Sequence, residues 1–319
     1  MKAQFEASVA SQDSAGSRCE IMKMKIWISA SLTWVLAATY SMHAALPTKE
    51  QNQQLMPQEF APGIVSTGHE FGISFAPDGT EAYFSRFAVN QPIHIFRTHL
   101  INGVWQEPEK LSISGDDWSD LDPFVSLDGK QLFFISTRSE LGAAGGNSKK
   151  NMDIWVSVRS GLEWTPPHRL ENVNSSAKQG SPTVARNKTL YFFSNRNGDA
   201  DKNALYLSRF KNGHYEPAVL LPSIVNVGPS DTSPFIAPDD KTLLFYSTRP
   251  GGFGKADLYV SYKKHGKWTA SVNLGPAVNS VDSDYNPAIS PDGRQLFFGR
   301  NSRLYVVPTK TIFKSRQFQ

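Results

Sequence analysis

The segment FAPDGTEAYFSR (residues 75–86) is the first of five related stretches in this chain. Each contains a short apolar run, a turn, and a second apolar run that ends near an arginine. The other four are VSLDGKQLFFISTR (125–138), VARNKTLYFFSNR (184–196), IAPDDKTLLFYSTR (236–249) and ISPDGRQLFFGR (289–300). The turn residues Asp78, Asp128, Asn187, Asp239 and Asp292 are 50, 59, 52 and 53 positions apart. This period fits one propeller blade of four short strands, so the repeats predict a β-propeller.

Each repeat divides into four expected strands, which we name a to d in chain order. Strand a precedes the turn and strand b follows it, because a tight polar turn between two apolar runs is typical of a hairpin. Strand c is expected at residues 94–98, 153–157, 204–208, 257–261 and 303–307. A glycine-containing turn with an aromatic residue then leads to strand d. We expect these aromatic residues, which are Trp105, Trp164, Tyr215 and Trp268, to pack between neighbouring blades.

The fifth repeat has no strand d of its own. Residues 60–70 (FAPGIVSTGHE) align without a gap to residues 274–284 (LGPAVNSVDSD), which connect strand d of the fourth repeat to the next strand a. We therefore expect residues 58–60 to pair beside residues 304–307, which closes the ring and removes an exposed sheet edge.

The predicted fold is all-β, a five-bladed β-propeller of four-stranded antiparallel blades closed by an N-terminal strand. The expected blades are residues 71–111, 121–171, 180–221, 232–274, and 285–307 together with 58–60. A short helix or coil is expected in the tail, residues 309–319.

Residues 1–45 are predicted to be an N-terminal extension with a secretory signal peptide, followed by one propeller domain at residues 46–319. The apolar run 26–39 follows two lysines and precedes small residues, as in a signal peptide. It is short for a membrane span, and the alternative is an N-terminal anchor. The single cysteine, Cys19, precedes this run, so the mature chain is expected to have neither disulfides nor thiolate metal sites.

The composition limits the classes of partner. Aromatic residues make up 12% of the chain and charged residues 19%, which is typical of a folded domain. The net charge of +4 comes with no clustered basic face, so no nucleic-acid partner is expected.

Two sets of charged residues recur with the repeats. One position, eight residues before each turn residue, holds Glu70, Asp120, Gln179, Asp231 and Asp284; the other holds the arginines after strand b, Arg86, Arg138, Arg196, Arg249 and Arg300. Because strands a and b are antiparallel, both sets are expected at the same end of the propeller, near the channel mouth. One interpretation is structural, with each carboxylate bonded to an arginine or a loop amide that locks neighbouring blades. The other is a polar mouth that binds a ligand.

Two further features are expected at this end. The loop 139–152 carries Lys149 and Lys150 and is either a contact region or a solvated insertion. His69, Glu70 and His94 could converge in the first blade as the site of a polysaccharide-active enzyme. The sequence has neither an H-E-x-x-H nor a G-x-S-x-G motif, and it lacks a D-x-D-x-D-G calcium loop. We therefore predict no catalytic residues, metal or cofactor.

The chain has SPDG-like turns such as Pro-Asp-Gly (291–293), which are followed by LYF or LFF and then by Ser-x-Arg, as at 247–249. This pattern resembles the PD40 (WD40-like) repeats of TolB-type propellers. The resemblance covers residues 58–307, without a counterpart of the TolB N-terminal α/β domain. It implies an exported, periplasmic or secreted bacterial protein, expected to be monomeric, that acts as a binding or scaffold module for an envelope protein or peptide. A glycan is a possible ligand, and the alternative function is a polysaccharide lyase or hydrolase.

Overall fold

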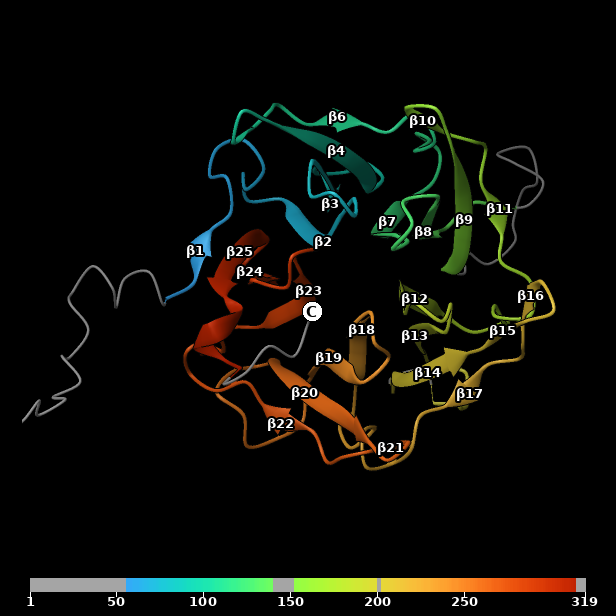
Figure 1. The fold of residues 1–319 in the computed structure, drawn as a ribbon, viewed down its shortest axis with the longest axis vertical. Helices are drawn as coiled ribbons and strands as arrows, with labels where there is room; N and C mark the ends of the chain where they lie inside the picture. Colours follow the sequence, from blue (N-terminus) through green and yellow to red (C-terminus); the bar gives the residue numbers. More distant parts are fainter. Residues whose placement is uncertain (1–55, 140–151, 200–201, 314–319) are drawn as a thin grey trace, which may run out of the picture. The chain divides into compact units, whose positions relative to one another are not determined.

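Five antiparallel sheets follow one another around a central axis in the computed structural model (Figure 1). The structure describes residues 56–139, 152–199 and 202–313. The predicted five-bladed β-propeller is therefore confirmed. The predicted signal peptide, the boundary between residues 45 and 46, and Lys149 and Lys150 lie outside the described residues.

The first four blades share one arrangement, with strand a beside the axis and strands b, c and d following outward (Figure 1). Strands a to d are β2 (Glu70–Phe75), β3 (Glu81–Arg86), β4 (His94–Ile101) and β6 (Glu109–Lys110) in blade one; β7 (Asp120–Val125), β8 (Gln131–Ser136), β9 (Asp153–Ser160) and β11 (His168–Arg169) in blade two; β12 (Gln179–Val184), β13 (Leu190–Ser194), β14 (Ala204–Ser208) and β17 (Val219–Leu220) in blade three; and β18 (Asp231–Ile236), β19 (Thr242–Ser247), β20 (Asp257–Lys264) and β22 (Val272–Asn273) in blade four. The hairpins beyond strand c contain β5 (Val104–Trp105), β10 (Glu163–Trp164), β15 (Phe210–Lys211) with β16 (His214–Tyr215), and β21 (Lys267–Trp268).

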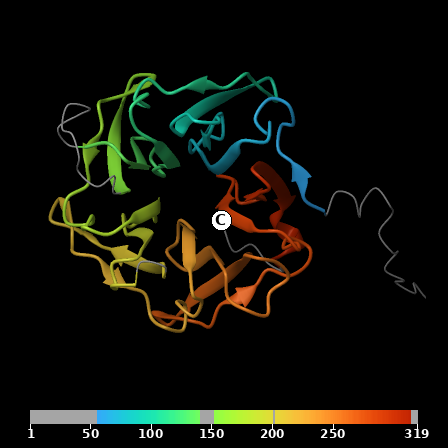
Figure 2. The same ribbon diagram turned by 180° about the vertical axis from the view of Figure 1, so that it is seen from behind.

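The fifth blade combines the two ends of the propeller. It contains β23 (Asp284–Ile289), β24 (Gln295–Arg300), β25 (Arg303–Pro308) and the N-terminal β1 (Gln58–Glu59). Strand β1 is antiparallel to β25, with Gln58 opposite Val306. The amide of Phe60 continues this pairing, since it donates to the Leu304 carbonyl at 2.8 Å. The predicted closure of the ring is confirmed, and Figure 2 shows the same pairing from behind.

The core lies between blades. Five clusters of buried apolar side chains each join two consecutive blades around the ring. Because both faces of strand b are covered by neighbours, its sequence is continuously apolar instead of alternating. The aromatic residues of the hairpins take part as predicted. Trp164 contacts Tyr83 of the preceding blade at 6.0 Å between ring centroids, and Trp268 contacts Tyr191 at 6.2 Å.

Each innermost strand contains a bulge at its third residue. The register between strands a and b shifts there in all five blades. The bulged residues, all with φ between 45° and 59°, are Gly72, Asp122, Ser181, Ser233 and Asn286. In blades two to five the next residue is a proline, which lacks an N–H and is tolerated in a strand at a bulge or on an edge. Bulges redirect side chains, and these bring the third residue of each strand to the axis.

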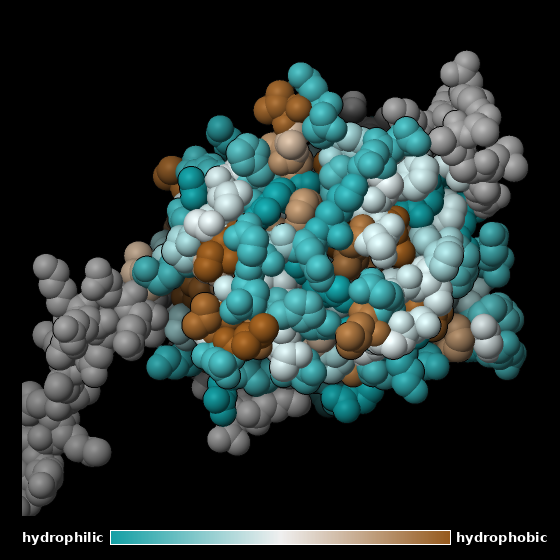
Figure 3. All heavy atoms as spheres, turned by 90° about the horizontal axis from the view of Figure 1, so that it is seen from above, coloured by the Kyte–Doolittle hydropathy of each residue, from teal (hydrophilic) through white to brown (hydrophobic). Residues whose placement is uncertain are grey.

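The chain beyond the last strand forms a short 3-10 helix, η1 (Thr309–Thr311), which agrees with the helix or coil expected there. Phe313 packs into the cluster between blades four and five. Within the described ranges, no helix has the length and apolar character needed to cross a membrane. The outer edge that Figure 3 shows is mostly hydrophilic, with hydrophobic residues in small groups.

Candidate functional site

The predicted acids and arginines form one ion pair within each of four blades. Glu70, Asp120, Asp231 and Asp284 are at most 1% exposed. Their carboxylates lie 2.6 to 2.8 Å from the guanidinium groups of Arg86, Arg138, Arg249 and Arg300. Each arginine also donates to a backbone carbonyl of the preceding d-to-a connection, as Arg300 does to Val278. This geometry is the one the structural interpretation expects. That these residues bind a ligand stays a prediction.

Glu70 illustrates how such a buried carboxylate is kept charged. Burial alone would raise its pKa, but the Oγ1 and amide of Thr67, the amide of His69 and the guanidinium of Arg86 bring the pKa below its ordinary value. The Thr67 amide donates to Glu70 Oε2 at 2.7 Å, so the carboxylate also orders the loop before β2.

Blade three departs from this pattern because Gln179 replaces the acid. The Gln179 amide donates to Ser175 Oγ at 2.6 Å and to the Ala177 carbonyl, which holds the same loop without a charge. Arg196 donates to Ser194 Oγ and to the Val173 carbonyl, and burial lowers its pKa.

The two histidines of blade one have separate neighbours. The His69 ring packs edge-on against Phe87, with 5.2 Å between centroids. His94 Nε2 lies 3.8 Å from Asp116, and burial together with Lys110 lowers the His94 pKa. That His69, Glu70 and His94 converge as a site stays a prediction.

The recess of the propeller lies on the axis and opens toward the a–b turns. It is a pocket of about 440 Å³, lined by the later residues of all five strands a and by the turns that follow them. None of the predicted site residues in the described ranges lines it, because the acids and Gln179 begin strands a and the arginines lie at the ends of strands b or just after them. The pocket is therefore a second candidate binding site, separate from the acids and arginines.

The floor of this pocket consists of the bulged residues of the five blades. Ser181 Oγ donates to Asp122 Oδ2 at 2.5 Å, and Asn286 Nδ2 donates to Asp122 Oδ1 at 2.9 Å. Ser233 Oγ connects the other two side chains, at 3.0 Å from Ser181 Oγ and 3.3 Å from Asn286 Oδ1. The fifth bulged residue, Gly72 of blade one, has no side chain. A Cβ at Gly72 would lie 2.9 Å from Asp122 Oδ1, so the glycine makes room for this network.

Asp122 is the carboxyl group of the floor. Its side chain is buried, and burial raises its pKa even though Ser181 and Asn286 donate to it. Its backbone amide donates to Ser85 Oγ of blade one at 2.9 Å, which fixes the bulge. A buried carboxyl group held by neutral donors beneath apolar walls is a candidate for function.

The walls of the pocket are apolar and its rim is mixed. Phe75, Phe124, Phe235 and the prolines of the bulges line the walls. Arg186, Lys188 and Asp128 stand at the rim. The Ser126 hydroxyl donates to Asp128 Oδ1 at 2.6 Å and lowers the Asp128 pKa. An apolar recess with a few fixed polar groups is the usual form of a ligand site in proteins.

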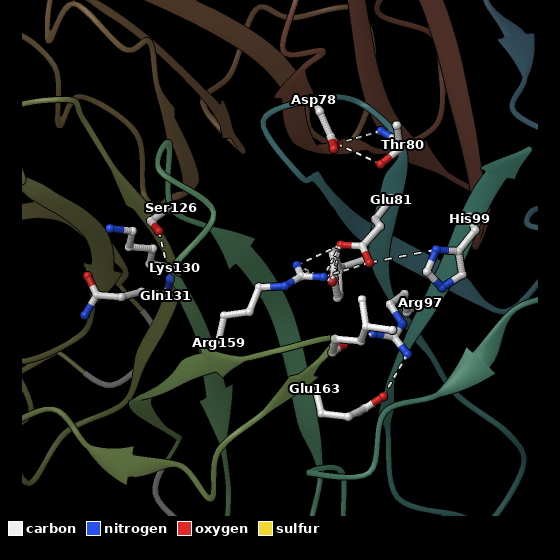
Figure 4. Close-up of polar contacts among 12 residues, drawn as sticks. Asp78, Thr80, Glu81, Arg97, His99, Ser126, Lys130, Gln131, Arg159 and Glu163 are labelled. Carbon is white, nitrogen blue, oxygen red and sulfur yellow. Dashed lines mark hydrogen bonds and ion pairs between the residues drawn. The ribbon is translucent and has the colours of Figure 1, made fainter.

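An ion-pair cluster ties blades one and two together near this rim (Figure 4). Arg159 of β9 places both terminal nitrogens 2.8 Å from the Glu81 carboxylate of β3, and Tyr83 donates to the same carboxylate at 2.8 Å. Burial would raise the Glu81 pKa, but the bonds from Arg159 and Tyr83 hold it below its ordinary value. Arg97 lies beside this group and bonds Glu109 and Glu163. The cluster joins β3 and β4 of blade one to β9 and β10 of blade two.

The floor residues were missed by the sequence reasoning, although a signal exists. In blades two to five a small polar residue precedes a proline within strand a, two positions after the acid or glutamine. A proline inside an expected strand indicates a bulge or an edge position, and bulges are frequent beside functional sites.

Comparisons with known proteins found only distant structural likenesses. No family model and no curated protein sequence matches the chain. Among solved structures, TolB from Acinetobacter baumannii has 16% identity and a TM-score of 0.46 over 75% of this chain. The chain spans 54% of that TolB's length.

Two other structures have similar scores. A protein assigned as TolB from Agrobacterium tumefaciens has 14% identity and a TM-score of 0.47, covering 72% of this chain and 69% of its own. An α-L-arabinofuranosidase from Lactobacillus brevis has 11% identity and a TM-score of 0.49, covering 78% and 93%.

Proposed function

We propose that this chain is an exported binding module whose axial pocket holds a segment of an envelope protein or peptide. The observation that carries the proposal is the pocket of about 440 Å³, with phenylalanine and proline walls above a polar floor. An extended peptide segment buries alternate side chains in such a recess and leaves its backbone near the polar rim.

The cellular context of the proposal comes from the sequence. The apolar run 26–39 supports export, and the PD40-like repeats support an envelope partner of the kind implied by TolB-type propellers. The ion-paired acids at the other end support a structural role for that end, which leaves the axial pocket as the binding surface.

Site-specific photo-crosslinking tests this proposal. A photoreactive amino acid at Gln131, which lines the pocket, should capture a partner from envelope extracts of the source bacterium. The same group at Leu162, which is 79% exposed and outside the pocket, is the matched control. Excess unmodified protein should compete for the captured partner. Equal products from both positions, or no product from Gln131, would refute the proposal.

A polysaccharide-active enzyme is the second candidate, and one observation favours it. Asp122 and Asp128 both line the pocket, and their environments shift their pKa values in opposite directions. One carboxyl group with a raised pKa and another with a lowered pKa are what a general acid and its partner need. Incubation with a polysaccharide panel tests this. Release of sugars that both Asp122→Asn and Asp128→Asn abolish would replace the binding proposal.

A further inference from the structure

The floor of the axial pocket has more hydrogen-bond acceptors than donors. Ser181 and Ser233 supply one hydrogen each and Asn286 supplies two, against about ten lone pairs on these side chains and Asp122. The single hydroxyl hydrogen of Ser233 can satisfy either Ser181 Oγ or Asn286 Oδ1, and not both. The ring therefore leaves acceptor oxygens available to a donor that enters along the axis.

The floor also contains a carboxyl group, that of Asp122, which forms no ion pair among the described residues. Four other acids of the inner strands are buried, and each is paired with an arginine of its own blade. Asp122 is 9% exposed, and its side-chain donors among the described residues are the neutral Ser181 and Asn286. Lys178 acts on Asp122 through its charge alone, and its Nζ lies over the Phe193 ring at 5.3 Å. A buried carboxylate without a cation is costly to the fold, and a bound cation would remove that cost.

We propose that the pocket floor binds a primary ammonium group, presented by a lysine side chain or by the amino terminus of the bound segment, with its charge against Asp122. This inference rests on the proposed binding function and adds the chemistry of the ligand. An ammonium group has three N–H donors and no acceptor, which matches the acceptor-rich ring. Phe124 and Phe235 on the walls suit the apolar stem of a lysine and the positive charge at its end.

The same contacts disfavour a guanidinium group. A bidentate arginine needs both oxygens of one carboxylate along a free edge. The two Asp122 oxygens are already engaged from either side by Ser181 Oγ and Asn286 Nδ2. A compact ammonium can instead approach several oxygens of the ring from above.

Matched peptides provide the direct test. The first is acetylated and amidated with one internal lysine, the second has norleucine in its place, and the third carries only a free amino terminus. Isothermal titration with the full chain should show binding of the first or third peptide. The norleucine peptide should bind at least about tenfold more weakly than the peptide whose ammonium group is bound, since hydrogen bonds to a charged group contribute about 1.5–3 kcal/mol. Comparison of the first and third identifies the source of the ammonium.

Variants assign the effect to Asp122. Asp122→Asn should remove the preference for ammonium over norleucine, while Asp117→Asn, an exposed acid outside the pocket, should keep it. Ser181→Ala retains the carboxylate and should also keep the preference. Thermal denaturation should find Asp122→Asn at least as stable as the parent, because a buried carboxylate without a cation destabilises the fold. If the carboxylate had a purely structural role, the variant would be less stable than the parent.

Competition on the unchanged protein tests the inference without any variant. Methylammonium should displace the bound peptide, whereas tetramethylammonium, which has the same charge but no N–H, should not. Equal displacement by potassium or sodium ions would assign the floor to a metal cation and overturn the ammonium inference. Binding of the norleucine peptide as tight as that of both ammonium-bearing peptides, or no binding of any peptide, would overturn it as well. Crosslinking from Gln131 decides the proposed function separately.

Discussion

Phe60 offers a direct test of how the ring is closed. It follows β1 and is 8% exposed. Its ring contacts Phe297 of blade five at 5.0 Å and Trp105 and Phe75 of blade one at 5.4 and 6.3 Å between centroids. Phe60→Ala removes one side of the cluster between these blades. Large-to-small changes of this kind cost about 3–5 kcal/mol. We expect a loss of this size in the free energy of unfolding.

Urea denaturation followed by tryptophan fluorescence measures this loss. Phe253→Ala is the matched control, because Phe253 is 48% exposed and its truncation should change stability by less than about 0.5 kcal/mol. Limited proteolysis of the same variants should cut the segment around β1 faster in Phe60→Ala, since the strand loses its anchor. If Phe60→Ala is as stable and as resistant as Phe253→Ala, β1 does not hold the ring together.

Three further outcomes are expected. Gly72→Ala should destabilise the propeller more than Gly79→Ala does. Both glycines have positive φ, but only a Cβ at Gly72 would meet a neighbour, Asp122 Oδ1 at 2.9 Å. Equal melting temperatures of the two variants would contradict this close approach. Glu81→Gln should cost about 1.5–3 kcal/mol at neutral pH by weakening the bidentate bond with Arg159, measured by chemical denaturation. The folded state lowers the Glu81 pKa, so its contribution is fully present above the ordinary value of 4.5 and is lost as pH falls through the folded pKa. The stability difference between Glu81→Gln and the parent should therefore shrink in acid, and a constant difference from pH 7 downward would refute this assignment.

The repeats alone were sufficient to predict the architecture. The turn period predicted five blades, the alignment of residues 60–70 with 274–284 predicted the closing strand, and the hairpin aromatics predicted the packing between blades. These features are local or periodic, so each can be recognised within one repeat or between two copies of it. The antiparallel order of strands a and b likewise placed the acids and arginines at one end.

The position and chemistry of the axial pocket depended on the tertiary structure. Asp122, Ser181 and Ser233 are 59 and 52 positions apart along the chain, and Asn286 is 164 positions from Asp122. They come within hydrogen-bond distance because five blades close around one axis and a bulge turns each side chain inward. The sequence determined which residues repeat. Only the closed ring decided that the paired acids are buried at one end while a carboxylate without a cation forms the floor of a pocket that opens at the other.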